Sequence, residues 1–237
     1  MISVCMATYN GEKYIKEQLD SILKQIGEND EIIISDDGST DLTNSILKQY
    51  ASKYSNIKIE KGPGQGVIKN FENALMHSEG DYIFLSDQDD IWVDGKVKKI
   101  MEQFNKKKAS VVLHDAVIVD GNGTEIGESF FKHRGSKPGF IKNIVKNSYL
   151  GCCMAFDRNI LNIALPFPEK IEMHDWWIGL LGELYGGIIF IDDKFLKYRR
   201  HGNNVSSFHH HPLSKMIFNR VYLVLQITKR MRRRSKK

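Results

Sequence analysis

Apolar residues follow two different spacings along the first hundred positions of the chain. Four short apolar runs predict buried strands, at residues 2–8, 31–35, 56–60 and 81–86. Between these runs, apolar residues at helical spacing predict helices from Glu12 onward, after a turn at 36–41, and around 67–78 and 94–107. Strands that alternate with helices indicate an α/β fold, with a parallel sheet flanked by helices.

The second half of the chain has a less regular pattern. Residues 110–120 predict a long strand, and residues 140–147 predict a short helix. Another helix is expected at 174–185, and the segments GGIIFID and KFLKYRRH predict two strands that pair as a hairpin. A last helix is expected from about Leu213 to Met231. The sheet is therefore expected to be mixed but mostly parallel.

Polar residues directly follow three of the predicted strands. They are Asn10 after the first strand, Asp36 and Asp37 after the second, and Asp87 and Asp89 after the fourth. In parallel sheets, ligands bind beyond the carboxyl ends of the strands. The three signals therefore predict one ligand-binding edge of the sheet.

Three carboxylates crowd into four positions in the segment Asp87-Gln88-Asp89-Asp90. Like charges this close repel each other, so a cation or solvent must compensate them. Two carboxylates one residue apart on a turn suit Mg²⁺ or Mn²⁺, which favour oxygen ligands and bind phosphate oxygens as well. The alternative is a solvated acidic turn in which Asp90 caps the next helix.

Three further residues each admit two interpretations. Asp36 stands in a sequence with good turn chemistry, but its carboxylate would also accept the N3–H of a pyrimidine base. Asp175 stands at the start of a predicted helix. It would be either the N-cap of that helix or a general base that takes a proton from a hydroxyl group. His201, taken alone, is more typical of a surface histidine than of a ligand.

Charge is distributed unevenly along the chain. No acidic residue follows Asp193 but 13 lysines and arginines do, so residues 1–193 carry −8 although the whole chain carries +5. The apolar-rich segment 216–237 ends in a basic cluster, which suits an interfacial helix on anionic lipid. The alternatives are a helix packed on the body with a solvated charged end, and a tail that binds nucleic acid.

The cysteines and the N-terminus indicate the compartment. Cys5, Cys152 and Cys153 form no CxxC motif and are expected to be small buried residues in a reducing environment. The first residues lack the features of a signal peptide, and no apolar run approaches the roughly 20 residues of a membrane-spanning helix. We therefore expect a cytoplasmic protein.

Six segments of the chain form an ordered set of motifs. They are SVCMATYNGEKYIKEQLDSIL, IIISDDGSTD, DYIFLSDQDDIW, GCCMAFDR, MHDWWIGLL and KYRRHGNNV. Together they closely resemble the family 2 glycosyltransferases, the inverting enzymes of the GT-A fold. The SDQDDIW version looks most like the branch that builds O-antigen, capsule and related bacterial polysaccharides, including rhamnosyltransferase-like members. The resemblance implies a catalytic domain over 1–207 and a basic amphipathic tail over 208–237.

The resemblance also implies which residues contact the nucleotide. Thr8, Tyr9, Asn10 and Glu12 would border it at the end of the first strand. Asp36 would hold the pyrimidine ring.

For the metal and the reaction, the resemblance implies a second set of residues. Asp87 and Asp89 would be the family's DxD pair, with Asp89 on the divalent cation and Asp87 on the ribose or the metal. His201 would be a further metal or diphosphate contact. Asp175 would be the catalytic base, and 150–156 would line the acceptor side.

The function implied is an inverting transfer of one sugar from a UDP- or dTDP-linked donor, with Mn²⁺ or Mg²⁺ as cofactor. The acceptor would be a polyprenyl-diphosphate-linked saccharide or a growing bacterial surface glycan. The QxxRW motif of processive members is absent, so we expect a single addition. We also expect peripheral binding to the inner face of the cell membrane through the tail, and no nucleic acid partner. A metal-dependent phosphohydrolase or nucleotidyltransferase, and a basic-tailed nucleic-acid-binding module, remain alternatives.

Overall fold

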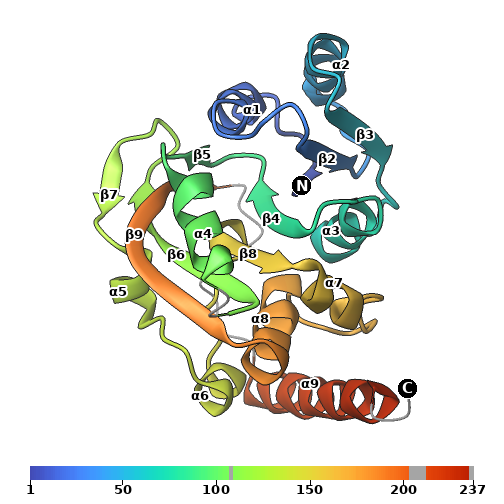
Figure 1. Cartoon of the computed structure of the whole chain (residues 1–237), viewed down its shortest axis with the longest axis vertical. Coiled ribbons are helices and arrows are strands. Elements are labelled where there is room, and N and C mark those ends of the chain that lie inside the picture. Colours follow the sequence, from blue (N-terminus) through green and yellow to red (C-terminus); the bar gives the residue numbers. More distant parts are fainter. Residues whose placement is uncertain (107–108, 203–211, 235–237) are drawn as a thin grey trace.

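The computed structural model describes residues 1–106, 109–202 and 212–234, which build one mixed sheet with helices on both faces (Figure 1). The strands follow the order β3-β2-β1-β4-β8-β6-β9-β5, and β7 pairs with β6. Their bounds are β1 (Ile2–Thr8), β2 (Glu31–Asp36), β3 (Ile57–Lys61), β4 (Tyr82–Asp87), β5 (Ile91–Trp92), β6 (Val111–Val119), β7 (Glu125–Gly127), β8 (Met154–Asp157) and β9 (Ile188–Arg199).

The N-terminal half of the sheet is parallel, as the sequence predicts. β1 pairs with β2 on one side and β4 on the other, and β2 pairs with β3. Helices cover both faces, so the strands are apolar on both faces. In β1, Val4 and Met6 enter one core, whereas Cys5 between them enters the other.

The helices form a layer on each face of the sheet. On one face lie α1 (Ile15–Leu23), α2 (Thr43–Lys53) and α4 (Lys96–Asn105). On the other face lie α3 (Val67–Met76), α7 (Arg158–Ala164), α8 (His174–Tyr185) and α9 (Leu213–Arg234). The shorter elements are α5 (Phe130–Arg134), α6 (Phe140–Val145) and the 3-10 turn η1 (Gly151–Cys153).

The second half of the sheet mixes strand directions. β8 runs antiparallel to both β4 and β6, and β6 runs parallel to β9. Consequently β6 and β9 point the same way as β4, and their carboxyl ends reach the edge where β4 ends. The mixed, mostly parallel sheet predicted from the sequence is confirmed.

The predicted hairpin between GGIIFID and KFLKYRRH is wrong, because both segments belong to the single strand β9. β6 pairs His114 with Ile191 but the next residue, Asp115, with Lys194. The intervening Asp192 and Asp193, which resemble a turn in the sequence, are exposed and form a bulge. A bulge absorbs the polar pair without reversing the chain, so β9 reaches the functional edge of the sheet.

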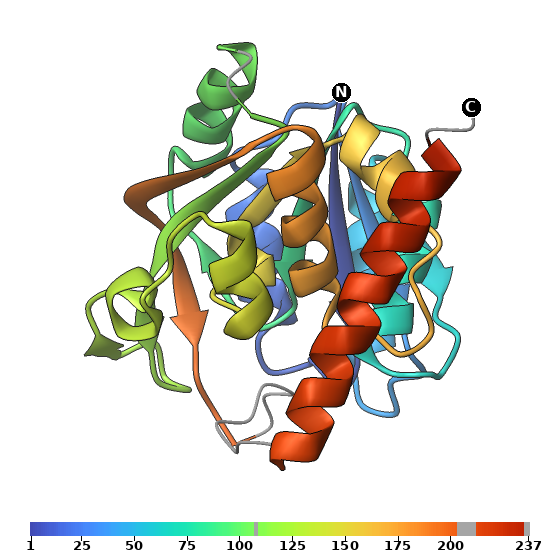
Figure 2. The ribbon, with the colours of Figure 1, turned by 90° about the horizontal axis from the view of Figure 1, so that it is seen from below.

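The C-terminal helix α9 packs along the body of the protein (Figure 2). Leu223 and Ile227 are buried in the core that α8 shares with the sheet. Arg220 donates hydrogen bonds to the carbonyl of Val145, and Arg230 donates to the carbonyls that follow α7. The helix ends at Arg234, slightly beyond the predicted end at Met231.

Among residues 1–106, 109–202 and 212–234, no helix combines the length and apolar character needed to cross a bilayer. The expected domain boundary between 207 and 208 lies outside the described residues. The three cysteines are buried and unpaired, as expected.

The packing of α9 gives a stability prediction. Leu223→Ala should lower the free energy of unfolding by about 2–5 kcal/mol, because it leaves a cavity in the core. Leu225→Ala is the matched control: Leu225 is 54% exposed, so its change should stay within about 0.5 kcal/mol. Urea denaturation measures both, and equal effects would show that α9 does not depend on this contact.

Candidate active site

The predicted acids gather at the carboxyl edge of the parallel strands. In the sheet register, Thr8 of β1 lies beside Asp36 of β2, and Ala7 of β1 lies beside Asp87 of β4. Asp36 and Asp87 therefore flank the same strand end, two strand spacings or about 10 Å apart. The edge predicted from the sequence exists.

Asp36 is held by a dense set of hydrogen bonds. Its Oδ1 accepts from the backbone N–H groups of Gly38 and Ser39 and from the Asn44 amide, and its Oδ2 accepts from the hydroxyls of Thr8 and Ser39. A carboxylate has about four lone-pair sites, so its acceptor capacity is engaged by the chain itself. Asp36 thus fixes the turn at 36–39.

Asp37 organises the glycine-rich loop that follows β3. Its two oxygens accept the N–H groups of Gly64 and Gly66, both at 2.7 Å. Gly64 and Gly66 have φ values of 69° and 86°, a region that favours glycine. This loop is thereby tied to the end of β2.

The loop after β1 is locked to its neighbours. Asn10, at φ 50°, accepts the Thr40 N–H at 2.8 Å through its side chain. Glu12 accepts the Leu42 N–H at 2.8 Å. The Tyr9 ring remains free to meet a ligand, because Tyr9 is 56% exposed.

Gln88, between the two acids of the DxD segment, joins β4 to the loop after β1. Its amide accepts from the Tyr9 N–H and donates to the Tyr9 carbonyl, both at 2.9 Å. A Cβ on Gly11 would meet the Gln88 Oε1 at 2.3 Å, so a larger residue at position 11 would push the Gln88 amide out of these two hydrogen bonds. No pattern in the sequence indicated this role of Gln88.

Asp89 and His201 lie side by side. His201 Nε2 is 2.8 Å from Asp89 Oδ2, and the His201 ring stacks on Tyr14 at 5.0 Å between centroids. Carboxylate and imidazole donors on one side of a turn that also carries Asp87 suit a divalent cation. These residues fit the divalent cation that the family resemblance implies.

Arg199 supports this pair from behind. The sequence analysis did not predict this role. The Arg199 guanidinium donates to the Asp89 carbonyl at 2.7 Å and to Glu17 at 2.6 Å, and its backbone N–H donates to Asp90 at 2.8 Å. Arg199 also lies 4.7 Å from the Tyr14 ring. One buried residue at the end of β9 therefore holds the acidic turn.

Asp87, Asp90 and Cys152 form a cluster beneath the turn, with ligand atoms within 4.8 Å of one another. Burial, and then the charges of Asp89 and Asp175, raise the pKa of Asp87 to about 7. Asp90 does not cap α4, whose N-cap is Gly95. It is buried, and burial likewise raises its pKa.

Asp175 reaches the same region from the start of α8. The N-cap of that helix is Met173, so Asp175 is not the cap. Burial raises the pKa of Asp175 to about 6, and its charge acts on Asp87. The neighbouring His174 is buried against Phe71, and burial lowers its pKa to about 3, so it stays neutral.

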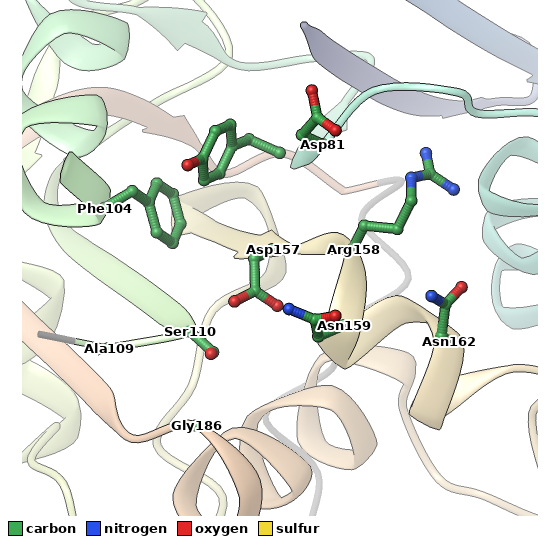
Figure 3. A pocket seen from close by; sticks show the side chains of 10 residues that line it. Asp81, Phe104, Ala109, Ser110, Asp157, Arg158, Asn159, Asn162 and Gly186 are labelled. Atoms are coloured by element: carbon green, nitrogen blue, oxygen red, sulfur yellow. The ribbon is translucent and has the colours of Figure 1, made fainter. Parts of the chain in front are cut away.

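A hollow of about 500 Å³ lies elsewhere, at the start of β4 and the end of β8 (Figure 3). Asp81, Asp157 and Arg158 line it, and Arg158 is turned toward the carbonyls of Ser78 and Gly80. This is the edge of the sheet opposite the acids. Side-chain chemistry, and not the size of this hollow, therefore identifies the candidate site.

A family model described as Glycosyl transferase family 2 matches residues 3–163. The chain belongs to this family. The matched part of the glycosyltransferase includes the Asp87–Asp89 turn, whereas Asp175 and His201 follow it. Their assignment therefore depends on the geometry described above.

Two curated relatives agree with the family. The chain is 31% identical over 217 residues to the dTDP-rhamnosyl transferase RfbG of Shigella flexneri, covering 84% of this chain and 72% of the relative. It is 26% identical to the UDP-Glc:alpha-D-GlcNAc-diphosphoundecaprenol beta-1,3-glucosyltransferase WfgD of Escherichia coli, covering 97% and 94%.

The structural likeness is to S. aureus TarS 1-349 in complex with UDP-GlcNAc. The TM-score is 0.74 at 23% identity, covering 95% of this chain and 66% of that one. At this identity the likeness shows the fold alone, which is the GT-A fold expected from the sequence.

The raised pKa of Asp175 gives a pH-dependent stability prediction. A carboxyl group with an ordinary pKa of 3.8 and a folded-state pKa of about 6 destabilises the fold once it ionises. Asp175→Asn should therefore gain stability relative to the wild type as pH rises from 4 to 7, by about 2–3 kcal/mol. Urea unfolding at both pH values measures this gain, and a pH-independent difference would contradict the buried-charge explanation.

Proposed function

We propose that this glycosyltransferase catalyses an inverting, metal-dependent transfer of one sugar from a nucleoside-diphosphate sugar. The observation that carries the proposal is the meeting of three groups at one edge of the sheet. Asp87 ends β4 and Asp89 follows it, His201 contacts Asp89, and the charge of Asp175, at the start of α8, acts on Asp87. A cation-binding group and a separate carboxylate base are what such a reaction requires.

On the donor side, the nucleotide would lie over the loops after β1 and β2. The exposed Tyr9 ring offers a face to a base. Thr8, Asn10 and Glu12 shape this region through their hydrogen bonds to the 36–42 segment. A base N3–H contact to Asp36 would share an oxygen that already accepts from Ser39 or Thr8.

Asp89 and His201 would hold the divalent cation, with Asp87 on the cation or the donor ribose. When bound, the cation stabilises the charge that develops on the departing diphosphate. An imidazole ligand favours Mn²⁺ over Mg²⁺, because Mg²⁺ prefers oxygen ligands throughout. Arg199 keeps the turn in shape through the Asp89 carbonyl and the Asp90 carboxylate.

Asp175 would act as the general base toward the acceptor hydroxyl. Its pKa of about 6 leaves it mainly ionised near neutral pH yet basic enough to take a proton. An acceptor oxygen activated by Asp175 attacks the anomeric carbon from the face opposite the diphosphate, so the configuration inverts. The proton moves from the acceptor hydroxyl to the Asp175 carboxylate as the new bond forms.

The relatives suggest the substrates. RfbG is a dTDP-rhamnosyl transferase, and WfgD is a glucosyltransferase with UDP-Glc as donor and a GlcNAc-diphosphoundecaprenol acceptor. We therefore propose a UDP- or dTDP-sugar as donor and a lipid-linked or growing bacterial surface glycan as acceptor. Residues 150–156 would line the acceptor side, because Gly151 packs against His174 and Asp175.

Two variants test this mechanism. UDP or dTDP should raise the melting temperature of the wild type only with Mn²⁺ or Mg²⁺ present, and Asp89→Ala should abolish that rise. Asp175→Asn should keep the rise but lose transfer by about 10²-fold or more, because the base is gone while the donor site remains. Calorimetry and a panel of nucleotide sugars provide the measurements. If Asp175→Asn transferred sugar at the wild-type rate, Asp175 would not be the base.

We also propose that α9 attaches the enzyme to an anionic membrane surface at the inner face of the cell membrane. Its outward side carries an apolar stripe at helical spacing, comprising Ile217, Phe218, Val221, Val224 and Leu225, each 40–58% exposed. On α6, Ile141 and Val145 are 76% and 62% exposed, and Arg220 of α9 bonds to the Val145 carbonyl. The two helices therefore offer one apolar surface.

Basic residues accompany this α6–α9 surface. Lys142 lies on α6, Lys146 follows it, and Lys215, Lys229 and Arg232 lie on α9, all of them exposed. Apolar residues among cations suit the boundary between lipid headgroups and acyl chains, where the apolar groups insert and the cations meet anionic headgroups. A nucleic-acid partner would use the charges but leave the apolar stripe in water.

Vesicle binding tests the membrane proposal. The protein should sediment with phosphatidylglycerol vesicles and not with phosphatidylcholine vesicles, and Val221→Asp should weaken the binding by about tenfold. The control is Ser52→Asp, which adds the same charge at an exposed position of α2. Unchanged sedimentation of Val221→Asp would contradict the proposal.

A further inference from the structure

Lys96 is a lysine in an unusual place. It is the first residue of α4, and no part of its surface is exposed. Its ammonium donates to the Cys152 carbonyl at 2.8 Å and lies 4.0 Å from the centre of the Trp92 ring. Lysine is almost never fully buried unless it is paired with a negative charge.

The groups that act on the Lys96 ammonium are two cysteines and two acids of the turn. Burial lowers the pKa of Lys96 to about 8, and Cys153, Cys152, Asp90 and Asp87, in that order, oppose this shift. Asp90 is 1% exposed, and its Oδ2 has no hydrogen-bond partner among the described residues. Both carboxyl groups lie within 4.8 Å of the Cys152 sulfur, and the backbone carbonyl of the same residue accepts a hydrogen bond from the Lys96 ammonium.

Each side of this arrangement requires the other. A buried ammonium without a counter-charge is strongly unfavourable, and so is a buried carboxylate with an open oxygen. Arg199 donates its backbone N–H to Asp90, and its guanidinium donates to Glu17 and to the Asp89 carbonyl. Lys96 supplies the positive charge from below the turn.

We propose that Lys96 is a positioning residue, a built-in counter-ion that holds Asp90 and Asp87 beneath the turn. Asp89 and His201, which contact each other, would hold the divalent cation of the proposed function. The turn keeps its shape before the donor arrives, because Lys96 offsets part of the repulsion beneath it. The part of this inference that concerns the cation rests on the proposed function, whereas the pairing of Lys96 with the two acids does not.

A double-mutant cycle on stability tests the pairing. Lys96→Gln removes the charge but keeps a hydrogen-bond donor, and Asp90→Asn removes the opposite charge at nearly constant shape. The double variant should be more stable than the sum of the two single effects predicts, by about tenfold in the unfolding equilibrium constant. A cycle of Lys96→Gln with Asp87→Asn should show coupling of the same sign.

The control cycle pairs Lys96→Gln with Asp81→Asn, because Asp81 lies at the opposite edge of the sheet. This cycle should be additive. Additivity in both the Asp90 and Asp87 cycles would overturn the proposal. If Lys96→Gln alone does not fold, recovery of folding in the double variant supports the pairing. Failure of the double variant while Asp90→Asn folds would contradict it.

Manganese gives a second readout that a purely structural lysine would not change. Without the internal cation, the acids depend more on an external one, so Mn²⁺ alone should raise the melting temperature of Lys96→Gln more than that of the wild type. An equal or smaller rise would contradict the counter-ion role. If Mn²⁺ shifts neither protein, the metal assignment fails, and the double-mutant cycles decide the role of Lys96 independently.

Discussion

Repulsion among carboxylates at the end of β4 is the constraint on which this site depends. Asp87, Asp89 and Asp90 come from one short turn, and Asp175 adds a fourth charge from α8. The protein compensates them from several directions, with His201 beside Asp89 and Arg199 behind the turn. Because Arg199 ends β9 and His201 follows it, the continuity of that strand matters for the chemistry.

A second feature is the mutual locking of loops around the donor region. Gln88 binds the Tyr9 backbone, Asn10 binds Thr40, and Asp37 binds the glycine-rich loop. Each bond joins segments that are far apart in the chain but adjacent at the sheet edge. A pocket built in this way needs little rearrangement when a ligand binds, which favours tight binding of the correct donor.

Much of this architecture was predictable from the sequence. The spacing of the apolar residues predicted the strands and helices of the parallel half of the sheet. Asp36, Asp87 and Asp89 could be placed at its carboxyl edge because each lies at or just after the end of a predicted strand. The roles of these residues at the donor remain predictions. The match to the family shows the reaction class, a glycosyl transfer, and the roles of Asp175 and His201 are part of the proposed function.

The rest was not accessible because it depends on contacts between distant segments. Arg199 braces Asp89 across 110 positions, and no local pattern reports such a pair. Asp192 and Asp193 resembled a turn, and only the register with β6 shows the bulge. Lysine is usually a surface residue, so the burial of Lys96 had no signature in the sequence.

The contact between Gln88 and Gly11 has an evolutionary consequence. The amide of Gln88 occupies the space where a side chain at position 11 would begin. A larger residue at 11 therefore displaces the Gln88 amide and breaks its two hydrogen bonds to Tyr9, unless a shorter residue stands at 88. These two positions, 77 residues apart, should change together during divergence and form a covarying pair that separates one branch of the family from another.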